Sequence, residues 1–66
     1  MKLTAIIVDD ERLARRELRS LLAEFAEISI IGEAENLTEA VNLIQNQKPD
    51  VVFLDIQLQN ENGFDL

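Results

Sequence analysis

Three short apolar runs along the chain predict β-strands, and they lie at Leu3–Val8, Ile28–Ala34 and Val51–Leu54. The first and third contain unbroken stretches rich in β-branched residues, which is typical of strands buried on both faces of a parallel sheet. Polar residues and a glycine interrupt the second run, as in an edge strand. The pattern predicts three strands of one sheet.

Between these runs the apolar positions follow a helical period. One helix is predicted from Glu11 to about Phe25, and a second starts at Asn36, which forms a capping-box pattern with Glu39. Pro49 ends the second helix, because the residue before a proline is disfavoured in the helical region. The residues predicted to face inward are Ala14, Leu18, Leu21, Leu22 and Phe25 in the first helix, and Leu37, Ala40, Val41 and Ile44 in the second.

The predicted order is strand, helix, strand, helix, strand, with short connections and no internal repeat or linker. Right-handed crossovers make strands in this order parallel. A chain of 66 residues can form at most one small domain. We therefore expect residues 1–66 to form a single α/β unit that corresponds to one half of a doubly wound sheet.

Composition narrows the possible functions. The net charge of −7 argues against direct nucleic-acid contact, which needs clustered lysine and arginine. The absence of cysteine excludes disulfides and thiolate metal sites. No stretch has the length of a membrane helix, and the start of the chain lacks the apolar core of a signal peptide. We expect a cytoplasmic protein without membrane contact.

Four of the six basic residues lie in the first predicted helix, mostly off its apolar stripe; they are Arg12, Arg15, Arg16 and Arg19. Two interpretations remain open at this point. The arginines form either a solvated face supported by neighbouring acids or a face that docks a partner.

Carboxylates follow the first and third predicted strands. Asp9 and Asp10 come directly after the first, and Asp55 follows the third. In an open α/β sheet, ligands bind beyond the carboxyl ends of the strands, where the winding reverses. If the first strand lies between the other two, all three acids meet there. Either they only terminate strands and cap helices, or they bind a cation.

A divalent cation with a phosphoryl group would compensate the repulsion between these acids. Magnesium takes one or two carboxylates, keeps several waters and shares phosphate oxygens. A neighbouring aspartate can act as the nucleophile and form an acyl phosphate. The acidic residues therefore indicate magnesium-dependent phosphoryl transfer.

Two motifs resemble a known family. Ile6–Glu11 followed by Arg12–Arg15 is similar to the opening of a response-regulator receiver domain, and Val51–Gln57 is similar to its phosphorylation strand and loop. The resemblance implies a flavodoxin-like parallel sheet with strand order 2-1-3, truncated after the third strand. The sequence of the first predicted helix and of the residues after Asp55 resembles that of receivers attached to LytTR-type DNA-binding domains.

The resemblance also implies roles for individual residues. Asp55 matches the phosphoacceptor, Asp10 the direct Mg²⁺ ligand, and Asp9 the acid that helps to hold the ion, often through water. Gln57 matches the position whose backbone carbonyl completes the metal shell. Gly63, eight residues after Asp55, matches a loop glycine with positive φ. The implied partner is a sensor histidine kinase in a two-component phosphorelay, and the domain is a phosphoacceptor with no enzymatic activity beyond its own phosphotransfer.

The chain departs from the family in two ways. Gln59 replaces the usual proline four residues after the acceptor, so we expect a less rigid loop. Receivers also continue for a second half, which supplies a switch Ser or Thr and a phosphate-pairing Lys; we expect this chain to lack that half and an output domain. An exposed third strand would then favour association with a second copy.

Two alternative functions follow. The chain could be a fragment that cannot switch and acts only through self-association. It could also be a haloacid-dehalogenase-like phosphotransferase with Asp9 as the nucleophile, although Glu11 stands where that family has an aspartate and its catalytic lysine is absent.

Overall fold

The computed structural model describes residues 2–55. It contains β1 (Leu3–Val8), α1 (Arg12–Leu22), β2 (Ile28–Ala34), α2 (Leu37–Gln47) and β3 (Val51–Leu54). The alternation of strands and helices predicted from the sequence is confirmed.

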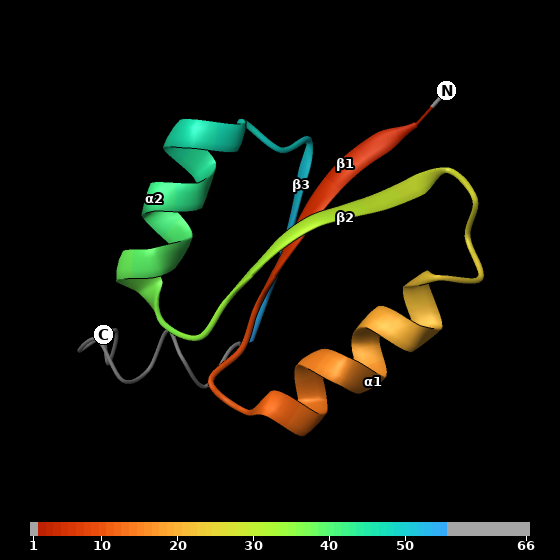
Figure 1. Cartoon of the computed structure of the whole chain (residues 1–66), viewed down its shortest axis with the longest axis horizontal. Coiled ribbons are helices and arrows are strands. Elements are labelled where there is room, and N and C mark those ends of the chain that lie inside the picture. Colours follow the sequence, from red (N-terminus) through yellow and green to blue (C-terminus); the bar gives the residue numbers. More distant parts are fainter. Residues whose placement is uncertain (1, 56–66) are drawn as a thin grey trace, which may run out of the picture.

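The three strands form one parallel sheet in the order β2-β1-β3 (Figure 1), as predicted. The register places Ala5 opposite Val51 and Val8 opposite Leu54. On the other side the register between β1 and β2 shifts after Ala5, so that β2 carries one extra residue, Ile31, at a bulge. β1 is therefore the central strand of the described sheet.

The two helices lie on opposite sides of the strands (Figure 1), as right-handed crossovers require when the winding reverses at β1. Ile6 and Val8 pack toward α2 with Ala34 and Ala40, and this cluster is the main core. Ala5 and Ile7 are also fully buried; they alternate with Ile6 and Val8 and so face the α1 side of the sheet. Partly buried Ile31, Leu37 and Leu43 extend the main core.

Gly32 lies where β2 and α2 approach each other closely. A Cβ atom at this position would lie 3.3 Å from both terminal carbons of Leu43. A larger residue would therefore press on the helix. The glycine allows α2 to pack down on the sheet next to the bulge.

Both helices end with recognisable backbone signals. α1 stops at Leu22, before the predicted end at Phe25, because the chain tightens into a turn in which the Phe25 N–H donates to the Leu22 carbonyl at 3.0 Å. α2 ends at Gln47, and its C-cap residue, Lys48, adopts a left-handed conformation with φ of 48°. Neither helix has the length and hydropathy that a membrane span would need, within the part of the chain that is described.

The start of α2 confirms the predicted cap. The Asn36 side-chain oxygen accepts a hydrogen bond from the Glu39 N–H at 2.8 Å. The Glu39 carboxylate accepts in turn from the Glu35 N–H at 3.1 Å. The reciprocal bond therefore goes to the residue before the cap, one position earlier than in the usual capping box.

The sequence pattern assigned too many helical residues to the inward faces of α1 and α2. Leu21, Phe25, Val41 and Ile44 are exposed, with between 40% and 62% of their surface accessible. Adjacent helical residues point about 100° apart. Once Leu22 faces the sheet, Leu21 therefore turns away from it.

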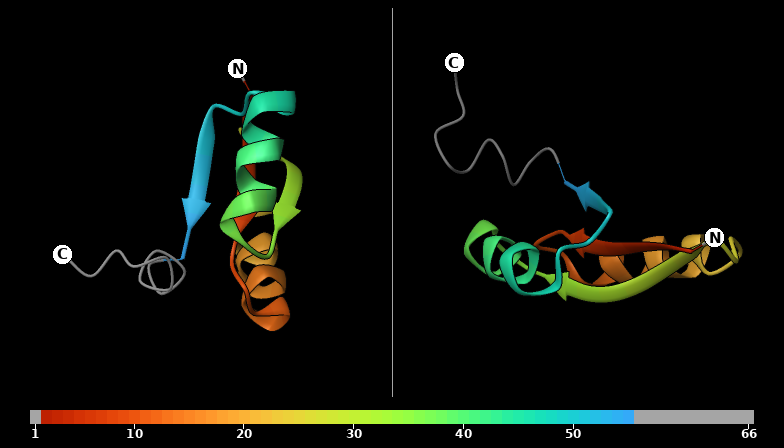
Figure 2. Two further views of the ribbon diagram at one scale, coloured as in Figure 1. Left: turned by 90° about the vertical axis from the view of Figure 1, so that its left-hand side faces the viewer. Right: turned by 90° about the horizontal axis from the view of Figure 1, so that it is seen from above.

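β3 lies at the edge of the described sheet, next to β1 (Figure 2). The prediction that this strand is buried on both faces is wrong for the described residues, because Val52 and Leu54 are 38% and 39% exposed. The outcome agrees with the expectation of an exposed third strand.

The start of β1 is tied to the loop before β3. The Asp50 carboxylate accepts hydrogen bonds from the Thr4 N–H at 2.8 Å and from the Thr4 hydroxyl at 3.1 Å. The Asp50 N–H donates to the Thr4 carbonyl at 2.9 Å. These bonds hold the two strands in the register that aligns their carboxyl ends.

Candidate functional site

The hydrogen-bonding ladder of the sheet continues past the carboxyl ends of the strands and positions two of the acids. The Asp55 N–H donates to the Val8 carbonyl at 3.0 Å. The Asp9 N–H donates to the Ala34 carbonyl at 3.0 Å. The Val8–Asp9 junction is therefore bonded to both neighbouring strands, and the backbone of each acid is set by the sheet.

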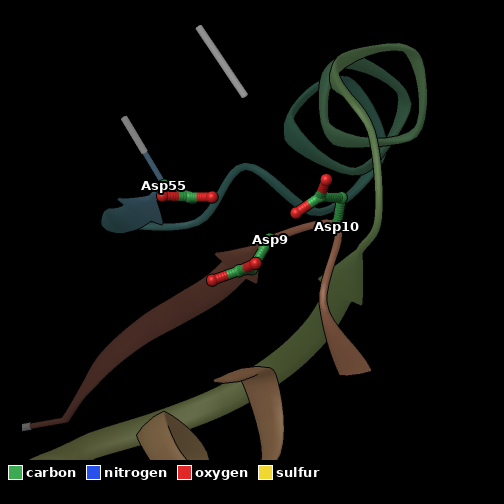
Figure 3. A group of neighbouring side chains, drawn as sticks. All are labelled: Asp9, Asp10 and Asp55. Carbon is green, nitrogen blue, oxygen red and sulfur yellow. The ribbon is translucent and has the colours of Figure 1, made fainter. Parts of the chain in front are cut away.

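The structure brings Asp9, Asp10 and Asp55 together, as the sequence predicts. One carboxylate oxygen from each can be chosen so that all three lie within 4.8 Å of one another. Figure 3 shows the side chains side by side at the ends of β1 and β3. Asp9 and Asp55 are half-buried and Asp10 is exposed, so the cluster is open to solvent on the Asp10 side. Gln57 and Gly63 lie outside the described residues.

The cluster fits a magnesium ion by the chemistry of its donors. Carboxylate oxygens are the ligands that this hard cation prefers, and two ligand oxygens on one octahedral Mg²⁺ lie about 3–4 Å apart. The 4.8 Å limit on the separations is slightly wider than this. Such spacing suits a shell in which water completes the coordination beside one or two direct carboxylates.

The loop between β1 and α1 is held by bonds to Asp9. The Glu11 N–H donates to Asp9 Oδ1 at 2.9 Å, and the Arg15 guanidinium donates through Nη1 to the Asp9 carbonyl at 2.7 Å. α1 has no side-chain cap at Glu11, so the Asp9 carboxylate supplies the acceptor at this end of the helix. The same residue thus shapes the loop and faces the acidic cluster.

Arg15 belongs to an ion-pair network that the sequence alone did not reveal. Arg15 Nε lies 3.2 Å from one carboxylate oxygen of Glu33, and Arg19 Nε lies 2.6 Å from the other. The hydrogen bond from Arg19 is the main cause that lowers the pKa of Glu33 below 4.5; the Arg19 charge and the bond and charge of Arg15 add to it, whereas partial burial opposes it. The network joins α1 to β2.

The four arginines of α1 therefore do not share one role. Arg15 and Arg19 pair within the chain, while Arg12 and Arg16 are exposed and have no ion pair among the described contacts. The four-residue spacing of Arg15 and Arg19 was a visible signal that both lie on one face of the helix. Nothing in the sequence pattern indicated that Glu33 would lie opposite them.

Comparison with known proteins identifies the family of this chain. The family model described as "Response regulator receiver domain" matches residues 5–66. An uncharacterized response regulatory protein of Vibrio cholerae is 52% identical over 97% of this chain, and the sensory transduction protein LytT of Bacillus anthracis is 50% identical over the same share. The LytT protein of Bacillus subtilis is also 50% identical.

The chain spans about a quarter of the length of these curated relatives, 26% to 27% of each. No solved structure matched the chain. The similarity therefore concerns one segment of longer proteins.

Proposed function

Because this chain belongs to the response regulator receiver domain family, a family of two-component signalling modules and not of classical enzymes, we propose that Asp55 accepts a phosphoryl group from a sensor histidine kinase in the presence of Mg²⁺. The observation that supports this most directly is the convergence of Asp9, Asp10 and Asp55 within 4.8 Å at the ends of β1 and β3. Family membership favours this function over the haloacid-dehalogenase-like alternative with Asp9 as nucleophile.

In the proposed reaction a carboxylate oxygen of Asp55 attacks the phosphorus of a phosphohistidine. The new phosphorus–oxygen bond forms as the phosphorus–nitrogen bond breaks, and the electron pair of that bond returns to the imidazole. Asp10 and Asp55 would hold the metal directly with the backbone carbonyl of Gln57, and Asp9 would hold it through water. The bound ion would neutralise charge on the transferring group.

The chain's own backbone contributes the positioning. The hydrogen bond from the Asp55 N–H to the Val8 carbonyl holds the acceptor residue beside the strand that carries the other two acids. Most of the rate enhancement in phosphoryl transfer comes from positioning and electrostatics. A nucleophile tied to a three-stranded sheet suits this reaction.

We extend the proposal to the whole protein. Relatives about four times as long are described as sensory transduction proteins, which supports a regulator in which phosphorylation of this domain redirects a LytTR-type DNA-binding output domain. We propose that the protein is cytoplasmic, in keeping with the proposed kinase partner. Self-association through the exposed face and edge of β3 is a further proposal, supported by the exposure of Val52 and Leu54.

The test is phosphorylation of the full-length protein with acetyl phosphate and Mg²⁺, followed by intact mass. The wild type should gain one phosphoryl group, and Asp55→Asn should gain none. Glu24→Gln, which changes an exposed acid on the far end of the α1 segment, is the control and should behave like the wild type. Equal incorporation in the wild type and Asp55→Asn would reject Asp55 as the acceptor.

A further inference from the structure

Arg15 is the described side chain that connects the acidic cluster to the α1–β2 network. Its Nη1 donates to the Asp9 carbonyl at 2.7 Å, and its Nε donates to Glu33 at 3.2 Å. Only 15% of the side chain is accessible. A guanidinium with two fixed acceptors and little exposure has few alternative positions.

The carbonyl that Arg15 binds is the one that sets the direction of Asp10. The Asp9 carbonyl and the Asp10 N–H belong to the same peptide group, which is planar. A bond that holds this oxygen therefore limits rotation of the whole peptide and, with it, the orientation of the Asp10 Cα atom. Asp10 itself is exposed, so it depends on its backbone for placement more than a packed residue would.

Glu33 in turn fixes Arg15. One of its oxygens binds Arg15 and the other binds Arg19, so the carboxylate is held from two turns of the same helix. Arg19 contacts Glu33 but has no hydrogen bond to the β1–α1 loop among the described contacts. The two arginines therefore share the network, and they differ in whether they also reach Asp9.

We propose that Arg15 is a positioning residue for metal binding, which holds the Asp9–Asp10 peptide in the orientation that lets Asp10 bind the ion. The inference rests on the proposed function, because it concerns the same Mg²⁺ site. Arg15 acts through the backbone of Asp9 and does not itself contact the metal. Groups that orient metal ligands typically change metal affinity about 10- to 100-fold when they are removed, and we expect a loss of about 10-fold or more.

The experiment compares Mg²⁺ affinity of the full-length protein, measured by isothermal titration calorimetry, in Arg15→Met and Arg19→Met. Each variant removes one positive charge and one bond to Glu33, but only Arg15→Met removes the bond to Asp9. Arg15→Met should bind Mg²⁺ about 10-fold more weakly than the wild type, whereas Arg19→Met should stay within about twofold. Amide NMR spectra with Mg²⁺ should show the same difference at Asp10.

A purely structural role for Arg15 predicts a different result, in which both variants lose stability and neither loses affinity. Wild-type affinity in folded Arg15→Met would overturn the inference and leave the proposed function intact. Should Arg15→Met fail to fold, Arg15→Lys decides: a single ammonium nitrogen cannot reproduce the two fixed donor positions of the planar guanidinium, so affinity should fall, and unchanged affinity would overturn the inference. Asp10→Asn should bind no Mg²⁺. If the wild type also bound none, that result would reject the proposed function and this inference with it.

Discussion

Replacing Asp10 by asparagine should stabilise the metal-free protein and remove its stabilisation by Mg²⁺. The physical reason is repulsion within the acidic cluster. Asp10 faces two other carboxylates whose oxygens lie within 4.8 Å, and no hydrogen bond to its side chain is among the described contacts. The substitution keeps the shape of the side chain and removes its charge.

The size of the effect follows from Coulomb's law. Two unit charges 4.8 Å apart repel by about 1 kcal/mol in a water-like dielectric and by about 3 kcal/mol at an effective dielectric of about 20. Because Asp10 is exposed, the lower value applies to each of its two pairs. The free energy of unfolding without metal should therefore rise by about 1–2 kcal/mol. In the wild type, Mg²⁺ at about 100 times its Kd should add about 2.7 kcal/mol.

Urea unfolding followed by circular dichroism, at a series of Mg²⁺ concentrations, measures both effects. Asp10→Asn should be the more stable protein without metal, and the wild type should overtake it as Mg²⁺ rises. Higher NaCl should reduce the metal-free difference by screening. Glu24→Gln controls for the change in net charge and should follow the wild type. An Asp10→Asn variant that is no more stable than the wild type without metal, or equal stabilisation of both proteins by Mg²⁺, would contradict this prediction.

Three further predictions concern the Arg15–Glu33–Arg19 network, the hydrogen bonds between Thr4 and Asp50, and the edge strand. The pKa of Glu33 is lower in the folded protein than its ordinary 4.5, so the stabilisation from Glu33 is complete above pH 4.5 and is lost as the pH falls through the folded pKa. Glu33→Gln should lack this component of acid unfolding. A wild-type pH profile of stability in that variant would contradict the prediction. Asp50→Ala should lower the free energy of unfolding by about 1–2 kcal/mol, because two Thr4 donors lose their carboxylate acceptor. An unchanged urea midpoint would show that these hydrogen bonds do not stabilise the fold. Val52→Lys should weaken self-association in analytical ultracentrifugation, since a charge on an exposed edge strand opposes pairing with another chain; a monomeric wild type would exclude this association.

The corrections to the sequence predictions share a cause. Leu21 and Val41 were assigned to inward stripes because apolar residues at helical spacing were counted without knowing the rotation of each helix on the sheet. In the structure Leu22 is buried on α1 and Leu43 packs against the core from α2. Gly32 lies close to Leu43, which is part of what sets the position of α2. Contacts of this kind join residues distant in sequence and leave no periodic signal.

The sequence by itself determined the strands, the helices, the parallel direction of the strands and the acids at the strand ends, because these follow from short-range patterns of apolar residues and from the handedness of crossovers. It also identified the family through two motifs. The strand order came from the resemblance to the family. Only the tertiary structure decided that Arg15 and Arg19 pair with Glu33 and that Arg15 reaches the Asp9 carbonyl. Those contacts depend on how α1 is rotated and placed against β2, and that placement results from packing across the sheet.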